Sequence, residues 1–459
     1  MSADAGARMR SDFDLVVIGG GSGGLAGAFA AAGHGARVAL LEPGELGGTC
    51  VNLGCVPKKA MWLAAELAGR IALAGEMGFP AASSVPDWER LIAHRQRYIA
   101  GIHAGYHQRL EAAGVVAMPC RGRLLDAHTV EAEDGTRLRT DRILLATGGR
   151  PKRPRIPGAE LGGVSDDFFG LERAPARVAI VGGGYIAVEL AGVLQALGSA
   201  VEVFARGPRL LPAMDAEVVT RLQEDLRRHG VRLHLRAPVR ALATAQERVR
   251  VLLEGDAEAL PEPFDRVLFA TGRRPNSGGL GLERAGVAIG ERGQVLVDAR
   301  EDTSVAGIHA VGDVTGKLAL TPVAIAAARR LMDRLFGGRA DAMLDYEQVA
   351  TVVFSRPPLA TVGLSEERAR ERHGEAVKVH TADFRPMLHA LARSEQRSLF
   401  KLVCVGEEER VVGIHLLGDA ADEILQGFAV ALKLGVTRRQ LEDTVAIHPT
   451  SAEEVVLMR

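Results

Sequence analysis

The chain has 459 residues, 47% of them hydrophobic and 25% charged, a length that suggests about three or four compact units with buried cores. Its formal net charge is −1, which gives no sign of nucleic acid or a membrane surface as a partner. No apolar run approaches the roughly 18 to 20 residues of a bilayer span, and four cysteines are too few for the disulfide framework of a secreted protein. We therefore expect a globular cytoplasmic protein, although two arginines near the N-terminus leave an organellar alternative.

The first predicted element is a strand, turn, helix and second strand over residues 14–42. The turn GGGSGG matches the G-x-G-x-x-G fingerprint of dinucleotide-binding folds. In that motif Gly19 permits the tight turn, Gly21 lets backbone N–H groups approach a pyrophosphate, and Gly24 lets the helix pack on the strand. The second strand ends at Glu42, whose carboxylate could accept a ribose hydroxyl.

Two of the four cysteines follow in GGTCVNLGCVPKK, residues 47–59. A regular helix would place Cys50 and Cys55 on different faces, so a bond between them requires a distorted first turn, which the neighbouring glycines favour. A redox-active pair is the preferred interpretation. Zinc lacks partner ligands at suitable spacing, so we expect no metal, and a coincidental pair of buried thiols is the third alternative. Cys120 and Cys404 stand alone and are expected to pack as small hydrophobic residues.

The same order of strand, turn, helix and strand is predicted again over residues 176–206, in ARVAIVGGGYIAVELAGVLQALGSAVEVFAR. This internal duplication implies a second bound nucleotide. Its fingerprint contains Gly182 and Gly184 but has Ala187 in place of the third glycine. The second strand ends without an acid, and Arg206 could pair with a 2′-phosphate, which favours NADPH over NADH. The alternative is that Arg206 is only a solvated surface charge.

Two further strands, DRILLATGGRP at 141–151 and DRVLFATGRRPN at 265–276, each end in a glycine turn and close the two nucleotide-binding units. After Asn276 a strand, a GD turn and a helix suggest that the chain returns to the first unit. From about Tyr346, strand runs broken by helices carry no fingerprint and predict a separate α+β domain for pairing or for closing a site. The predicted fold class is α/β, with two Rossmann-like (βαβ) nucleotide-binding domains followed by this C-terminal domain.

A dithiol needs a base that holds one thiolate and protonates the departing thiol of the substrate. His448, in TVAIHPTSAEEVV, is the strongest candidate, because Pro449 restricts the backbone and Glu453 could orient the imidazole. A lone histidine is more often structural. His415 and His389 lack such a turn before an acidic helix start and are weaker candidates.

Together these motifs resemble those of the pyridine-nucleotide disulfide oxidoreductases, and most closely the class I branch that reduces glutathione disulfide. The resemblance covers nearly the whole chain, through GGGSGG, GGTCVNLGCVPKK, VGGGYIAVELAG, ATGRRPN, AVGDVTGKLALTPVAIAAARRL, TVVFSRPPLATVGLSE, LQGFAVALKLG and AIHPTSAEE. It implies FAD on the first fingerprint, NADPH on the second, oxidised glutathione as substrate, and a homodimer with shared active sites. The implied domains are FAD-binding at 1–157, NADPH-binding at 158–277, a central return to the FAD domain at 278–345, and a dimerisation domain at 346–459.

The resemblance also implies residue roles. Electrons would pass from NADPH through FAD to a Cys50–Cys55 disulfide, with Cys55 against the flavin and Cys50 attacking the substrate. The base, His448 with Glu453, would come from the other subunit. Lys58 and Glu189 would form an ion pair near the flavin. Tyr185 would gate the nicotinamide pocket. The implied FAD contacts are Gly19, Gly21, Ser22, Gly23, Gly24, Glu42, Thr49, Lys58, Gly122, Gly148, Asp313 and Thr321. The implied NADPH contacts are Gly182, Gly184, Ile186, Ala187, Glu189, Arg206, Gly272 and Arg273.

Substrate choice depends on fewer residues. Arg329 occupies the place of an arginine that pairs with a glutathione carboxylate, and Ala26 stands where relatives with a cationic substrate carry an acid. Tyr98 and Tyr106 match tyrosines that line the substrate site, to which His448 also contributes. These positions imply an anionic substrate.

Two departures from the family pattern change the expectations. Phe29 stands where some members place a substrate-binding arginine, so that contact is expected to be absent. Pro212 replaces the second arginine of the 2′-phosphate clamp, which leaves Arg206 with Arg209 as its helper. We therefore expect a weaker NADPH preference than usual and detectable use of NADH.

Three other functions compete with this interpretation. A related low-molecular-weight disulfide reductase would share every motif. A dihydrolipoyl dehydrogenase-like enzyme would carry an acid at the ribose position of the second fingerprint. A flavin-binding redox sensor without turnover would have no need for the complete set Cys50, Cys55, Lys58, Glu189, His448 and Glu453.

Overall fold

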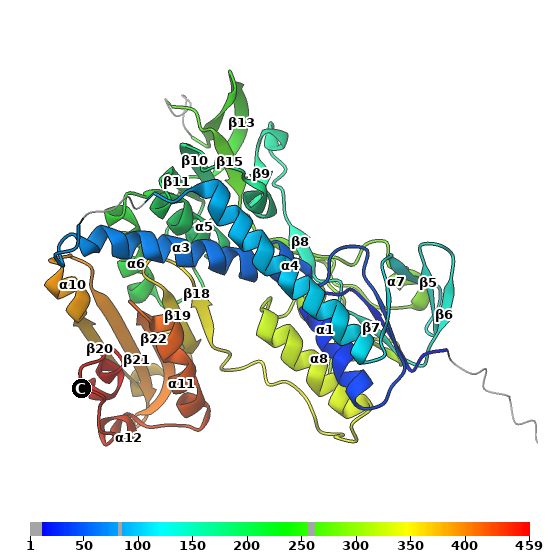
Figure 1. Ribbon diagram of the computed structural model, residues 1–459. Helices are drawn as coiled ribbons and strands as arrows, with labels where there is room; N and C mark the ends of the chain where they lie inside the picture. The colour runs from blue at the N-terminus through cyan, green and yellow to red at the C-terminus, as the bar shows by residue number, and fades with distance from the viewer. Residues whose placement is uncertain (1–11, 81–84, 256–261) are drawn as a thin grey trace, which may run out of the picture. The chain divides into compact units, whose positions relative to one another are not determined.

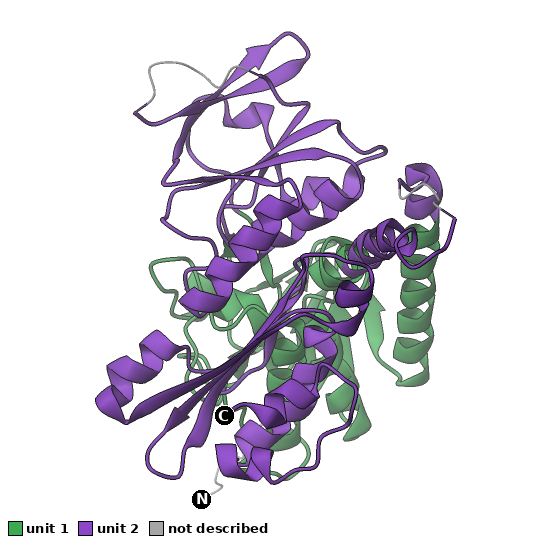
Figure 2. Ribbon diagram, turned by 90° about the vertical axis from the view of Figure 1, so that its left-hand side faces the viewer, with its two compact units in different colours: residues 1–58, 94–151, 273–345 green, residues 59–93, 152–272, 346–459 purple. Residues whose placement is uncertain are grey.

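The structure, a computed structural model, describes residues 12–80, 85–255 and 262–459 (Figure 1). The N-terminal arginines behind the organellar alternative lie outside the described residues. The chain forms two compact units, each assembled from three separate segments (Figure 2). Unit 1 comprises Met1–Lys58, His94–Pro151 and Arg273–Asp345, and unit 2 comprises Lys59–Ala93, Lys152–Gly272 and Tyr346–Arg459.

A five-stranded parallel sheet with strand order β17-β7-β1-β2-β3 forms the centre of unit 1. Alternate residues of its apolar strands enter two different hydrophobic clusters, so both faces of the sheet are covered, as is usual for parallel strands. The strands are β1 (Leu15–Ile18), β2 (Val38–Leu41), β3 (Val116–Met118), β7 (Ile143–Leu145) and β17 (Ile308–Ala310).

Helices α1 (Ser22–Gly33) and α8 (Thr321–Leu335) contact each other beside this sheet (Figure 1). Small residues line this contact, since a Cβ at Gly23 would lie 3.6 Å from Ala324 of α8 and a Cβ at Gly27 would lie 3.8 Å from Ala328. The antiparallel elements of unit 1 are β4 (Gly122–Leu124), β5 (Thr129–Ala132) and β6 (Arg137–Arg139) in one sheet, and β8 (Gly149–Pro151) with β16 (Arg273–Pro275). Its short helices are α2 (Gly48–Asn52), α7 (Leu282–Ala285) and η3 (Gly312–Thr315), and the longer α3 (Cys55–Ala74) and α4 (Trp88–Ala112) have residues in both units.

Unit 2 contains a second five-stranded parallel sheet, with strand order β12-β11-β10-β15-β9. Its strands are β9 (Gly163–Val164), β10 (Arg177–Val181), β11 (Ala200–Ala205), β12 (Arg232–Leu235) and β15 (Arg266–Phe269). Around it lie α5 (Tyr185–Ala196), α6 (Ala216–Arg228), η1 (Ala159–Leu161), η2 (Ser165–Gly170) and the hairpin of β13 (Val239–Ala245) and β14 (Arg248–Leu253). This repeat of the first sheet's pattern confirms the predicted duplication.

The C-terminal part of unit 2 is an antiparallel sheet with strand order β18-β19-β22-β21-β20. Its strands are β18 (Thr351–Val353), β19 (Leu359–Gly363), β20 (Val377–Phe384), β21 (Ser398–Val405) and β22 (Arg410–Leu417). The helices here are α9 (Glu366–His373), η4 (Gly374–Ala376), α10 (Met387–Leu391), α11 (Ala421–Lys433), α12 (Arg438–Glu442) and α13 (Glu453–Leu457), of which α11 packs on β19 and β22. The predicted α/β class with a C-terminal α+β domain is confirmed.

A buried lysine joins α6 to this antiparallel sheet. Lys401 on β21 is 1% exposed, and its ammonium contacts the carboxylates of Asp215 at 3.1 Å, Glu217 at 2.9 Å and Glu366 at 2.7 Å. Burial opposes the charge, but these carboxylates together raise the pKa of Lys401 above its ordinary value. The ammonium is therefore charged in the folded protein and fixes α6 and α9 to the sheet.

Candidate active site

The two cysteines of the redox loop lie in separate helical turns of unit 1. Cys50 belongs to α2 and Cys55 begins α3, and the helix is interrupted between them at Leu53, whose φ is −140°. Gly47 adopts a φ of +97°, and a Cβ there would overlap Val51, so glycine is required at this entry to the loop. Both cysteines are free thiols in this structure. The predicted distortion between the two thiols is therefore present.

The two thiols are electrostatically unequal. A hydrogen bond to Cys55, burial, and the negative charge on Cys55 together raise the pKa of Cys50 above its ordinary value. The hydroxyls of Thr321 and Ser22 act in the opposite direction, and Thr321 Oγ1 lies 3.5 Å from Cys55 Sγ. The reduced pair therefore holds a proton on Cys50, which needs a base before it can act as a nucleophile.

Asn52 and His103 support the redox loop, and sequence reasoning assigned neither a role. The amide nitrogen of Asn52 donates to the backbone carbonyls of Glu45 at 3.1 Å, Leu46 at 3.3 Å and Gly48 at 2.9 Å. Its oxygen accepts a 2.8 Å hydrogen bond from His103 Nε2 on α4. The only sequence signal was a polar residue between the two cysteines, and His103 gave none.

The first fingerprint has the shape that FAD requires. Within the described chain, α1 has no side-chain cap and no acid in its first turn, so its N–H groups are free to meet a diphosphate. A Cβ at Gly21 would come no nearer than 3.8 Å to Gly48, whereas a Cβ at Gly19 or Gly24 would overlap backbone atoms. The glycines therefore have the steric roles predicted for them, and the residues present fit the group.

Glu42, at the end of β2, accepts backbone hydrogen bonds from Gly20 at 2.7 Å and from Gly44 at 2.9 Å. These bonds fix its carboxylate beside the fingerprint, where a ribose hydroxyl would bind. The other predicted FAD residues are also in unit 1, namely Ser22 and Gly23 in α1, Thr49 in α2, buried Lys58 in α3, Gly122 in β4, Gly148 after β7, Asp313 in η3 and Thr321 in α8. Burial raises the pKa of Asp313.

Arg273 was predicted at the NADPH site, but it belongs to unit 1. Its guanidinium donates to Thr49 Oγ1 at 3.2 Å and to the Gly149 carbonyl at 2.5 Å. Gly272, its predicted companion, belongs to unit 2. Arg273 therefore lies beside a residue of the predicted FAD site in its own unit.

The second fingerprint repeats the first geometry in unit 2. In the described chain α5 has neither a side-chain cap nor an acid in its first turn, and a Cβ at Gly184 would meet nothing within 4 Å. A Cβ at Gly182 would overlap the Ala270 carbonyl, and Ala187 is fully buried at the third position. Tyr185 and Ile186 begin α5, and Tyr185 is 43% exposed. These features fit a second dinucleotide.

Glu189 is buried in α5, and its carboxylate accepts a 2.9 Å hydrogen bond from the backbone of Phe354. Its predicted partner, Lys58, belongs to the other unit. The ion pair between Lys58 and Glu189 therefore stays a prediction.

Arg206 and Arg209, the cations predicted for the second nucleotide, differ in their surroundings. Arg206 follows β11 and is exposed. Arg209, predicted as its helper, instead donates to the Pro212 carbonyl at 3.0 Å and forms an ion pair with Glu367 at 3.2 Å. These contacts use its terminal nitrogens, so the structure does not support a helper role for Arg209. The backbone N–H of exposed Arg236 donates to the carbonyl of Gly207, the residue after Arg206, at 2.9 Å.

The predicted base is oriented by its predicted partner in unit 2. His448 Nδ1 lies 3.0 Å from the carboxylate of Glu453, and the His448 side chain is 80% exposed. Bonding at Nδ1 leaves Nε2 to face another molecule. His415 is buried between Thr361 and the Leu364 carbonyl, which explains its weaker candidacy.

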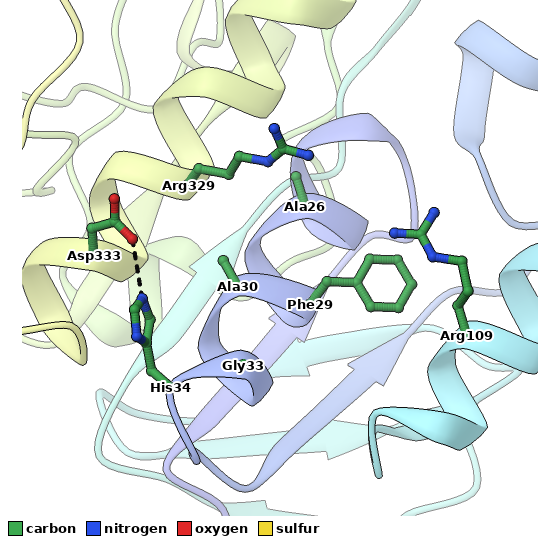
Figure 3. Close-up of a pocket in the computed structure, with 8 residues that line it drawn as sticks. All are labelled: Ala26, Phe29, Ala30, Gly33, His34, Arg109, Arg329 and Asp333. Atoms are coloured by element: carbon green, nitrogen blue, oxygen red, sulfur yellow. Dashed lines mark hydrogen bonds and ion pairs between the residues drawn. The ribbon is translucent and has the colours of Figure 1, made fainter.

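Four of the five predicted substrate residues lie in unit 1, whereas His448 belongs to unit 2. Ala26 and Arg329 line one pocket of about 420 Å³ (Figure 3). Burial raises the pKa of Tyr106, and an electrostatic contribution from Cys50 acts in the same direction, so this tyrosine lies close enough to the redox pair to interact with it. Tyr98, on the same helix α4, is 65% exposed. The pocket also contains Arg109, which sequence reasoning missed because it matched no motif.

Neither metal nor membrane features are found in the described parts of the chain. No group of three or more histidine, cysteine, aspartate or glutamate side chains there could hold a metal ion. No described helix is long and apolar enough to cross a bilayer.

The comparisons with known proteins give the class. Residues 13–328 match the model of the pyridine nucleotide-disulphide oxidoreductases, and residues 349–459 match the dimerisation domain of that family. The chain therefore belongs to the pyridine nucleotide-disulphide oxidoreductase family.

Within this family, the similar curated proteins are glutathione reductases. The chain is 43% identical to a glutathione reductase of Schizosaccharomyces pombe, covering 97% of this chain and 98% of the relative. It is 41% identical to a glutathione reductase of Yarrowia lipolytica (97% and 99%) and 40% identical to one of Nostoc sp. (98% and 100%). Among solved structures it resembles the Cu(II) complex of the HOCl-induced flavoprotein disulfide reductase RclA from Escherichia coli, with a TM-score of 0.87, 28% identity and coverage of 97% and 98%.

Proposed function

We propose that this protein is an NADPH-dependent, FAD-containing glutathione-disulfide reductase. The observation that carries the proposal is the geometry of the redox loop, in which Cys50 of α2 and Cys55 at the start of α3 lie within hydrogen-bonding distance of each other. Three glutathione reductases at 40–43% identity over nearly the full chain support this substrate. A Cys50–Cys55 disulfide is the oxidised form of this pair.

Bound FAD supplies two-electron transfer between the nicotinamide and the redox pair. The chain holds it through the uncapped N-terminus of α1 and the carboxylate of Glu42. The N-terminus of α5 offers the corresponding cradle to NADPH. Lys58 and Glu189 are proposed to form an ion pair near the first nucleotide, and Tyr185 to cover the second.

The reduced chain then performs two thiol–disulfide exchanges. The Cys50 thiolate attacks one sulfur of glutathione disulfide, which forms a mixed disulfide and releases one glutathione thiolate that takes up a proton. The Cys55 thiolate then attacks the sulfur of Cys50, which forms the Cys50–Cys55 bond, breaks the mixed disulfide and releases the second glutathione as a thiolate that takes up a proton from solvent. Two electrons pass from the dithiol to the substrate, and two thiols leave.

The base in this scheme is the imidazole of His448, oriented by Glu453. It first takes the proton from Cys50 and then gives it to the leaving thiolate. We propose that each base serves the redox pair of the other subunit in a homodimer, which the match of residues 349–459 to a dimerisation domain supports. The high exposure of His448 in one chain is consistent with a role in the other.

Nucleotide choice rests on Arg206, and we propose that Arg236 is the second cation near the 2′-phosphate. Both side chains are exposed, so their discrimination against NADH is expected to be modest. Steady-state rates with the two nucleotides test this proposal, which a preference for NADH would contradict.

We also propose that unit 1 contains most of the FAD-binding segments predicted at 1–157 and 278–345, although residues 59–93 and 152–157 belong to unit 2. Unit 2 would then contain the NADPH-binding domain predicted at 158–277, apart from residues 273–277, and the dimerisation domain at 346–459. We also propose a cytoplasmic location, which the small number of cysteines in the sequence favours.

The deciding experiment measures NADPH oxidation by the FAD-loaded protein with glutathione disulfide, trypanothione disulfide and lipoamide in parallel. Glutathione disulfide is expected to give the highest kcat/KM. A higher value with lipoamide would favour a dihydrolipoyl dehydrogenase-like enzyme. Turnover with none of the three would favour a sensor.

A further inference from the structure

The pocket in Figure 3 brings together three helices of unit 1. Ala26 and Phe29 come from α1, Arg329 and Asp333 from α8, and Arg109 from α4. Its two arginines extend over the same end of α1, with Ala26 and the ring of Phe29 below them (Figure 3). This end of the pocket therefore presents two cations to any ligand that enters.

Arg109 is held in this position by an aromatic ring. The centre of its guanidinium lies 4.4 Å from the centroid of the Phe29 ring, a distance at which the cation and the ring attract each other. Neither Arg109 nor Arg329 has an ion pair with any acid in the described parts of the chain, and both side chains are exposed. Their hydrogen-bond donors are thus left for a ligand.

The carboxylate in the pocket does not cancel this charge. Asp333 Oδ1 lies 3.0 Å from Nε2 of His34, and its other oxygen is 3.5 Å from the guanidinium of Arg339. Figure 3 shows the contact between His34 and Asp333 at the opposite end of the pocket from Arg109. The pocket is therefore polarised, with its unpaired cations at one end.

This cationic end is connected to the redox pair through α4. Arg109 follows Tyr106 by about one helical turn, and on the same helix His103 Nε2 lies 2.8 Å from the side-chain oxygen of Asn52 in the redox loop. A ligand held by Arg109 would therefore lie near the nucleophilic thiol. This placement suits a disulfide whose ends carry carboxylates.

We propose that Arg109 binds a carboxylate of the disulfide substrate together with Arg329, and that Phe29 serves as the platform for its guanidinium. This inference rests on the proposed function and deepens it. In this proposal Arg109 would supply a guanidinium in place of the one that is missing from position 29. A planar guanidinium can make the paired hydrogen bonds that a carboxylate accepts.

The first experiment compares the wild-type enzyme with Arg109→Gln. The KM for glutathione disulfide is expected to rise about tenfold while kcat changes little, because one charge-assisted contact in the bound state is lost. With a glutathione disulfide whose carboxylates are esterified, the two enzymes should have similar KM values. Equal KM values for the acid, or equal increases for acid and ester, would overturn the proposal.

The matched control is Arg284→Gln, which removes one exposed arginine from α7 of the same unit, outside the pocket. It should leave the KM unchanged. Arg109→Lys keeps the charge but loses the planar fork, and it should recover only part of the affinity. The double variant Phe29→Arg/Arg109→Gln returns a guanidinium to position 29 and should lower the KM again.

A binding measurement separates this proposal from the proposed function. S-methylglutathione cannot be reduced, and calorimetry reports its affinity for the FAD-loaded, oxidised enzyme without turnover. Weaker binding to Arg109→Gln than to wild type would support the carboxylate contact even if glutathione disulfide were not turned over. Equal binding to both enzymes, with wild-type turnover intact, would overturn the contact and leave the proposed function standing.

Discussion

At the scale of single residues, Cys50 and Cys55 are made different by their surroundings. The hydrogen bond with Cys55, burial and the negative charge on Cys55 all raise the pKa of Cys50, so deprotonation of one thiol makes the other harder to deprotonate. Two identical side chains can therefore have different roles, with Cys50 attacking the substrate and Cys55 resolving the mixed disulfide.

We expect Cys50→Ser to lose glutathione-disulfide turnover by at least about a thousandfold, because a serine hydroxyl cannot form the mixed disulfide. Reduction of the bound flavin by NADPH should persist, and stopped-flow absorbance would follow it. Cys120→Ser, which changes a half-buried cysteine outside the redox loop, is the control and should keep turnover. Residual turnover near wild type in Cys50→Ser would mean that another nucleophile acts.

Glu453 should affect the rate through His448. In Glu453→Gln the negative charge that orients and stabilises the protonated imidazole is lost, and kcat is expected to fall about 10- to 100-fold with little change in KM. Glu453→Asp should recover part of the rate. A fall in melting temperature without a change in kcat would indicate a purely structural role.

Local patterns could predict the redox loop and the glycine roles, because both arise from residues close together in the chain. They could not predict that His103 holds Asn52, since 51 positions separate the two residues. Local patterns also could not predict the contacts of Arg209. Its guanidinium binds acceptors that the fold brings close to it, namely Glu367 and the Pro212 carbonyl. Local patterns also could not predict that Arg109 lines the pocket, because its position depends on how α4 packs beside α1.

At the scale of elements, the contact between Lys401 and α6 should determine much of the stability of unit 2. Lys401→Met would leave Asp215 buried without its cation, and we expect the free energy of unfolding to fall by about 3 to 5 kcal/mol. Urea unfolding would measure the change. Lys378→Met removes an exposed ion pair with Glu409 and should cost less than about 1 kcal/mol. A similar loss in both variants would contradict the special role of Lys401.

The C-terminus of α6 should make unit 2 sensitive to acid. Burial and the charge on Arg356 lower the pKa of His229 from 6.5 to about 4, so the folded state favours the neutral ring. The stabilisation is complete above pH 6.5 and is lost as the pH falls towards 4, by up to about 3 kcal/mol. Replacing the ring in His229→Gln should reduce the difference between unfolding free energies at pH 7.5 and pH 4.5. An unchanged difference would contradict the assignment.

At the scale of the whole molecule, the proposed homodimer predicts how defective subunits combine. A dimer of one Cys50→Ser subunit and one His448→Gln subunit would contain one site with both changes and one with neither. After co-expression and separation with two affinity tags, this heterodimer should have about half of the wild-type activity, whereas either parent homodimer should be nearly inactive. An inactive heterodimer would place the base and the thiols in the same subunit.

The division of each unit into three segments has a consequence for synthesis on the ribosome. Strand β7, an interior strand of the first parallel sheet, pairs with β1 on one side and with the edge strand β17 (Ile308–Ala310) on the other. A nascent chain therefore lacks an edge of this sheet until about two thirds of its length has been translated. Cotranslational binding of FAD would have to wait for that strand, and until then a chaperone that shields the open edge of β7 would protect the chain from aggregation.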